Sequence, residues 1–162
     1  MTRSSAGFTL IELLVVVTIG AVLSSLVILA VGRWQSDDAP LRQAQRFAAQ
    51  LEFQCEQALF QGRPRALRLT AAGYESWQLG SSGWLPVPLS ASSRPRDWAA
   101  SVRPTLMIEG RGQALAEDED PPQIVCQPLG ERTPFELTLS GADVQVRLSG
   151  NAGGRLQLIE SP

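Results

Sequence analysis

The 162-residue sequence contains no histidine and no lysine, so all 14 of its basic residues are arginine. Without histidine, the chain lacks the side chain that most often acts as an acid or base near neutral pH and binds transition metals. Without lysine it cannot form a Schiff base, and no Ser/His or Cys/His nucleophile pair can be built. No motif combines a nucleophile, a base and an orienting group, and no Gly-rich phosphate loop follows a strand. We therefore expect no enzyme activity, no catalytic residues, no cofactor and no bound metal.

An excess of basic charge is also missing. The formal net charge is −2 at pH 7, and a nucleic-acid-binding chain would need a basic surface or tail. We therefore expect no nucleic-acid partner. The densest run of charge is acidic, at residues 117–120. Its four carboxylates are consecutive and lack the alternating ligands and turn glycine of an EF-hand loop, so a solvated loop is preferred to a calcium site.

What the sequence does contain is a long apolar run from Phe8 to Val31, in which Glu12 is the only formal charge. A helix of this length is roughly 36 Å long, enough to cross the ~30 Å hydrocarbon core of a bilayer. The run is longer than the apolar core of a cleavable secretory signal. We therefore predict a transmembrane helix over residues 8–31. A carboxylate inside such a span is costly, which makes Glu12 a functional candidate.

The string GFTLIELLVVVTIGAVL, which begins at Gly7, resembles the class III leader and N-terminal helix of type IV pilins and type II secretion pseudopilins. The resemblance implies that residues 1–7 are a leader peptide and that a prepilin peptidase cuts between Gly7 and Phe8. It also implies that the peptidase methylates the new amine of Phe8. The chain would then be a single-pass inner-membrane protein whose C-terminal domain, residues 32–162, lies in the periplasm.

Cleavage would give Glu12 an electrostatic partner. The new cationic amine of Phe8 on one subunit can meet the Glu12 carboxylate of its neighbour in the low dielectric of a helix bundle, where attraction is far stronger than in water. Such a pair favours assembly and selects one axial register. Two alternatives remain open. Glu12 is protonated, or it pairs with the Phe8 amine of its own helix, four residues earlier.

A second helix is predicted over about residues 38–61. Asp38 is a natural N-cap, Pro40 is tolerated in the first turn, and Gly62 with Arg63-Pro64 ends the helix. Gln50 and Gln57 are among the polar residues that fall off its apolar stripe. The stripe has a 3.6-residue period and consists of Leu41, Ala44, Phe47, Ala48, Leu51, Cys55, Ala58 and Leu59.

From Arg65 onward the apolar period changes to two, which is typical of half-buried antiparallel strands. Strands are predicted at about 65–70, 74–79, 84–89, 102–109, 124–126, 135–139, 144–148 and 156–158. The segments 86–103 and 113–123 are predicted as surface loops on composition. The fold class is therefore α+β. By the resemblance above the fold is pilin-like, with the second half of a long N-terminal helix packed on antiparallel sheet.

The cysteines and tryptophans are the remaining candidates. Cys55 lies on the apolar stripe and Cys126 shares a strand face with Ile124, so both are predicted to point into the core. A disulfide between them would close a long loop and contribute a few kcal/mol. Two buried free thiols are the alternative. Trp34 is expected at the membrane interface. For Trp77, Trp84 and Trp98 a core position is preferred to a contact with a partner.

The C-terminal region indicates which type of pseudopilin the chain resembles. The stretch from Gln127 to Leu137, followed by a strand pair and Gly153-Gly154-Arg155-Leu156, is similar to H-type minor pseudopilins of the GspH/FimT family and to related minor pilins. The resemblance implies a structural subunit of the periplasmic pseudopilus of a type II protein secretion system. Its partners would be other major and minor pseudopilins, the prepilin peptidase, the inner-membrane assembly platform, membrane lipid and secreted protein substrates.

Two other functions are alternatives to this one. The first is a minor pilin of a type IV pilus, which serves adhesion, motility or DNA uptake. The second is a membrane-anchored periplasmic enzyme. The missing histidine and lysine disfavour the enzyme.

Overall fold

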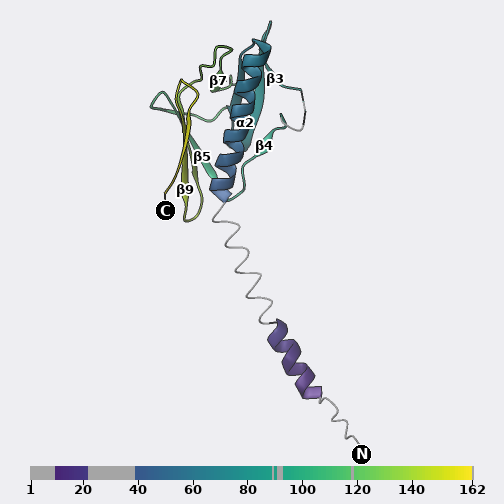
Figure 1. Cartoon of the computed structure of the whole chain (residues 1–162). Helices are drawn as coiled ribbons and strands as arrows, with labels where there is room; N and C mark the ends of the chain where they lie inside the picture. The colour runs from purple at the N-terminus through teal and green to yellow at the C-terminus, as the bar shows by residue number, and fades with distance from the viewer. Residues whose placement is uncertain (1–9, 22–38, 89, 91–92, 118, 162) are drawn as a thin grey trace, which may run out of the picture. The chain divides into compact units, whose positions relative to one another are not determined.

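The computed structural model describes residues 10–21, 39–88, 90, 93–117 and 119–161 (Figure 1). The chain divides into two units, Met1–Ser36 and Asp37–Pro162. In the first unit the described part is a helix over residues 10–21. The second unit contains one helix and ten strands within its described residues. The predicted N-cap Asp38 and the predicted interfacial Trp34 lie outside the described residues, as do both ends of the predicted 8–31 span.

The helix of the second unit, α2, covers Ala39–Gln61 and agrees with the predicted helix. Pro40 lies in its first turn, where no intrahelical donor is needed. At its C-terminal end Gly62 adopts a left-handed φ of 62°, and the amide of Arg63 donates to the carbonyl of Ala58 at 3.3 Å. This is the hydrogen bond of a Schellman cap, and a glycine at that position carries no Cβ penalty.

Two antiparallel five-stranded sheets follow α2 in the chain. The first has the order β3-β2-β1-β7, with β4 paired to β2. Its strands are β1 (Arg65–Leu69), β2 (Gly73–Gly80), β3 (Gly83–Pro86), β4 (Arg96–Asp97) and β7 (Ile124–Cys126). The second has the order β10-β9-β8-β5-β6. Its strands are β5 (Arg103–Ile108), β6 (Arg111–Gln113), β8 (Phe135–Ser140), β9 (Gln145–Gly150) and β10 (Leu156–Ser161).

The eight predicted strands are all present, and two further strands were not predicted. The strand expected over 84–89 ends at Pro86, and β10 continues to Ser161. The unpredicted β4 lies inside the segment 86–103 that was expected to be a loop. The unpredicted β6 is formed by a tight hairpin in which Glu109 and Gly110 both have positive φ, 51° and 77°. Both strands are short and lack apolar alternation, so only pairing with a neighbouring strand reveals them.

The core lies between α2 and both sheets. Figure 1 shows α2 running lengthwise beside the strands, and it contacts β1 and β7 of the first sheet and β8, β9 and β10 of the second. Phe47 is fully buried at this junction. Its ring centroid lies 6.1 Å from that of Trp98 and 6.2 Å from that of Phe135. One side chain of α2 therefore joins elements that are distant in sequence.

The buried face of α2 is wider than the apolar stripe predicts. Gln50 falls off the predicted apolar stripe, but only 7% of it is exposed, and Gln54 is completely buried. The amide Nε2 of Gln50 donates to Ser76 Oγ at 2.9 Å, and Gln54 Oε1 accepts from Arg65 Nη1 at 3.0 Å. Strands of both sheets contact the helix, so polar residues beside the stripe are buried too and need polar partners.

Candidate functional site

Glu12 is the only charged residue in the described N-terminal helix, residues 10–21. The large apolar side chains of this helix are exposed around its whole circumference, for example Leu10 at 83%, Ile11 at 71% and Val17 at 64%. The hydroxyl of Thr18 donates to the carbonyl of Leu14 at 2.7 Å, so this polar group is satisfied within the helix. A helix that is apolar all round needs lipid or other helices to cover it.

Glu12 is the one predicted site residue of the N-terminal segment that lies within the described residues. Gly7 and Phe8, the predicted cleavage and methylation positions, lie outside the described residues. Among the residues that the structure does describe, no helix is both long enough and apolar enough to cross a membrane.

Cys55 of α2 and Cys126 of β7 form a disulfide that ties the helix to the first sheet. Their Cα atoms are 5.0 Å apart and their positions differ by 71 residues. Of the two alternatives that the sequence left open, the structure therefore contains the bridge. In the chain-entropy account, closing a loop of this length stabilises the fold by about 4 kcal/mol.

Two buried arginines flank this disulfide, and neither was singled out from the sequence. Arg65 and Arg132 are the two residues that pair with Cys126 across the sheet. They are 6% and 4% exposed, and burial lowers the pKa of both guanidinium groups. Arg65 donates to Gln54 and, at 2.7 Å, to Gln61 Oε1. By the alternation of β1, Arg65 lies on the same strand face as Leu67 and Leu69, and Arg68 lies on the other face. That alternation was the available signal for the burial of Arg65.

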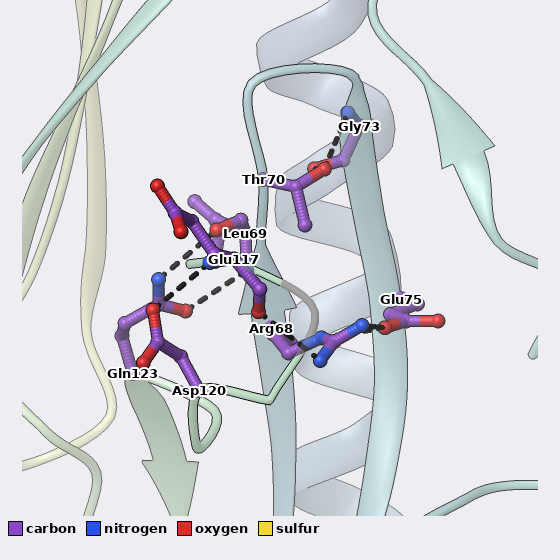
Figure 2. Close-up of polar contacts among 8 residues, drawn as sticks. All are labelled: Arg68, Leu69, Thr70, Gly73, Glu75, Glu117, Asp120 and Gln123. Atoms are coloured by element: carbon purple, nitrogen blue, oxygen red, sulfur yellow. Dashed lines mark hydrogen bonds and ion pairs between the residues drawn. The ribbon is translucent and has the colours of Figure 1, made fainter. Parts of the chain in front are cut away.

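The acidic loop is held against β1 by polar contacts that Figure 2 shows. The side chain of Gln123 makes reciprocal hydrogen bonds with Leu69, at 2.9 Å to its amide and 3.0 Å to its carbonyl. Asp120 Oδ2 accepts from the amide of Glu117 at 2.9 Å. Within the described part of the chain, no three His, Cys, Asp or Glu side chains are grouped so that they could hold a metal. One carboxylate of the run therefore stabilises the loop's own backbone.

Arg68 extends from β1 to the neighbouring strand in the same view. Its Nη2 lies 2.6 Å from Glu75 Oε1, and its guanidinium carbon is 4.7 Å from the centroid of a Trp77 ring. Trp77 and Trp84 are partly exposed, so the expected core position was wrong for them. It is correct for Trp98, which is 7% exposed and donates from Nε1 to the carbonyl of Thr70 at 3.1 Å.

Two protein families match the chain. The family described as the prokaryotic N-terminal methylation motif matches residues 2–28, and the family described as type II transport protein GspH matches residues 43–154. The type II secretion system protein H of Pseudomonas aeruginosa is 29% identical over 98% of this chain and 97% of that protein. The type II secretion system protein H of Escherichia coli is 29% identical over 84% of this chain and 81% of that protein.

Solved structures share the fold. The minor pseudopilin EpsH from the type II secretion system of Vibrio cholerae matches with a TM-score of 0.64 at 22% identity, over 76% of this chain and 97% of that one. The solution structure of E. coli GspH matches with a TM-score of 0.62 at 23% identity, over 79% of this chain and 93% of that one. The helix and the antiparallel sheets therefore form an α+β, pilin-like fold.

Proposed function

Because this chain belongs to the GspH family of type II transport proteins and is a minor pseudopilin of type II secretion, we propose that its N-terminal segment is an inner-membrane anchor that becomes an assembly helix. Residues 8–31 cross the membrane once, and residues 32–162 form the periplasmic domain. The subunit has a structural role in the pseudopilus and no enzymatic one.

The observation that carries this proposal is the isolated charge of Glu12. It is the single ionisable group among the described residues 10–21, in a helix whose large apolar side chains are exposed. The N-terminal methylation motif matches residues 2–28, which include Gly7, Phe8 and Glu12. We propose that the peptidase cleaves after Gly7 and methylates Phe8, and that the resulting amine pairs with Glu12 of the next subunit.

The energy of such a pair is large enough to control assembly. Two unit charges 4 Å apart attract by about 4 kcal/mol at an effective dielectric constant of 20. A charge left alone in a buried site costs about 3–5 kcal/mol. The Phe8 amine does not exist until the leader is removed, so processing and assembly are coupled through Glu12.

The proposed partners follow from this role. The other major and minor pseudopilins surround the N-terminal helix in the fibre, and membrane lipid covers it beforehand. The prepilin peptidase acts at Gly7 and Phe8, and the inner-membrane assembly platform extracts the processed subunit. Secreted protein substrates are moved by the assembled fibre.

The test uses the full-length chain produced together with the other pseudopilins of its own secretion system. Mass spectrometry of the N-terminus reports cleavage and methylation, and co-purification in detergent reports assembly. Glu12→Gln should be cleaved and should reach the membrane, but its co-purification should fall about tenfold or more, because the amine loses its carboxylate.

Thr18→Val is the matched control, because it removes a polar group from the same helix and leaves the charge in place. It should co-purify like the unmodified chain. Normal incorporation of the Glu12→Gln chain would contradict the proposed pairing.

A further inference from the structure

A hollow beside α2 is bordered by two arginines that have no acidic partner among the residues that the structure describes. It has a volume of about 390 Å³ and is lined by Arg46, Ala49, Gln50, Phe53 and Arg96. Both arginines are exposed, and neither forms an ion pair with any residue that the structure describes. Both guanidinium groups are therefore open to an anion that the described part of the chain does not supply.

The fold brings these arginines together from distant segments. Arg46 projects from α2, whereas Arg96 belongs to β4, which pairs with β2 through Gly73↔Asp97 and Tyr74↔Arg96. A Cβ atom at Gly73 would overlap the backbone carbonyl of Arg96. The glycine therefore allows β4 to lie close against β2, and this pairing fixes Arg96 at the rim of the hollow.

The positive charges of Arg96 and Arg46 both act on the buried hydroxyl of Tyr74. Tyr74 is 3% exposed, and its hydroxyl is buried with no hydrogen-bond partner in the described structure. Burial raises the pKa of Tyr74 to about 12, and the charges of Arg96 and then Arg46 act in the opposite direction. Both guanidinium groups are thus near enough to act on the same atom.

The lining also restricts what the hollow can accept. The amide of Gln50 is already engaged with Ser76 Oγ, and Phe53 and Ala49 supply apolar wall. Asp97 and Glu75 line a separate, smaller hollow that Arg96 also borders, and there Glu75 is paired with Arg68. The guanidinium groups of Arg46 and Arg96 can therefore bind an anion, and a carboxylate of a protein side chain matches their planar geometry with two parallel hydrogen bonds.

We propose that this hollow receives the carboxylate of an Asp or Glu side chain of a neighbouring pseudopilin subunit, held between Arg46 and Arg96. The inference rests on the proposed function, since a fibre supplies neighbours around α2, and the two positive charges of Arg46 and Arg96 complement a negative one. Exposed ion pairs contribute only about 0.2–1 kcal/mol each. The contact therefore selects the orientation and partner of the globular domain, whereas Glu12 acts in the N-terminal helix.

The absence of lysine from the sequence makes a direct test available. Arg96→Lys and Arg46→Lys, made one at a time in the full-length chain, each introduce the only side-chain amine of the protein. A carbodiimide joins an amine only to a carboxylate that touches it. After co-purification with the other pseudopilins, mass spectrometry should find each new amine linked to an Asp or Glu of a different subunit.

Arg111→Lys is the matched control, because Arg111 is exposed on β6 of the second sheet. It should give at least fivefold less adduct between subunits. Adducts of the Arg96→Lys and Arg46→Lys chains that stay within one chain, or that are no more frequent than the control's, would overturn the proposal.

A second measurement separates this proposal from the proposed function. The double variant Arg46→Glu/Arg96→Glu should lower co-purification with the other pseudopilins about fivefold, the effect of losing about 1 kcal/mol of charge pairing. Arg111→Glu should leave it unchanged. If the unmodified chain fails to co-purify with any pseudopilin, the proposed function is wrong. If it co-purifies and the double variant does too, only the carboxylate site is wrong.

Discussion

The ring of Phe47 meets the ring of Tyr74 edge to face, with centroids 5.0 Å apart. Phe47 comes from α2 and Tyr74 from β2, so this contact joins the helix to the first sheet. Phe47 also touches Phe135 of the second sheet. A single buried ring therefore holds three layers of the domain together.

Phe47→Ala should lower the free energy of unfolding by about 3–5 kcal/mol, because it removes a fully buried ring and leaves a cavity between both sheets. Urea denaturation followed by tryptophan fluorescence measures the change. Phe60→Ala, at a position that is 84% exposed, is the control and should change stability by less than about 0.5 kcal/mol. Equal effects of the two substitutions would contradict the assigned core.

Tyr74 should titrate well above the ordinary pKa of tyrosine, toward its raised pKa of about 12, because burial disfavours the phenolate. It is the only tyrosine in the chain, so the tyrosinate absorbance of the folded protein reports this residue alone. In denaturant the midpoint should return to about 10. A midpoint near 10 in the folded protein would show that Tyr74 is not buried.

The same shift makes stability depend on pH. Above the unfolded pKa the unfolded chain loses the tyrosine proton while the folded chain keeps it, so the free energy of unfolding should fall as the pH rises from about 10 to 12. Tyr74→Phe should remove this part of the pH dependence. A decline of the same size in the Tyr74→Phe chain would assign the effect to another group.

Replacing both cysteines, Cys55→Ala with Cys126→Ala, should lower the free energy of unfolding by about 4 kcal/mol, because the unfolded chain regains the freedom of a long loop. Denaturation under non-reducing conditions measures this. The chain has two cysteines, so thiol labelling of the denatured, unreduced protein should find none free, and labelling after reduction should find both. Two free thiols before reduction would show that the bridge is absent.

Gln54→Leu should destabilise the domain by about 2 kcal/mol although leucine is the more apolar residue. The buried guanidinium of Arg65 would lose the acceptor that it contacts at 3.0 Å, and an unsatisfied buried donor is costly. Gln45→Leu, on the exposed side of α2, is the matched control and should be close to neutral. A gain in stability from Gln54→Leu would show that the remaining acceptor of Arg65, Gln61, is sufficient for the buried guanidinium.

Gly7→Val should block processing of the leader and with it assembly, even though Glu12 is intact. Without cleavage the nitrogen of Phe8 stays in a peptide bond and carries no charge for Glu12 to pair with. The mass of the N-terminal peptide and co-purification with other pseudopilins measure the two effects. Gly20→Ala, where the added Cβ meets no described atom within 4 Å outside the backbone of its own helix, should be processed and incorporated normally. Assembly of an uncleaved chain would show that assembly does not require processing of the leader.

The local periodicity of the sequence was sufficient to predict the elements whose residues interact mainly with others nearby in the chain. The 3.6-residue spacing and the Gly62 cap predicted α2, and period-two alternation predicted the long strands. It could not predict β4, which exists because Gly73 lets another segment approach. Nor could it predict the burial of Gln50, which depends on how far the sheets extend around the helix.

The sequence by itself predicted the N-terminal segment, in which Gly7, Phe8 and Glu12 fall between positions 7 and 12, because that signal lies in short-range spacing. Only the tertiary structure decided that Cys55 meets Cys126 across 71 positions and that Arg46 and Arg96 line one hollow. The reason is physical. Contacts between distant segments are set by strand pairing and by packing around Phe47. A linear pattern does not contain the distance between Cys55 and Cys126 or the distance between Arg46 and Arg96.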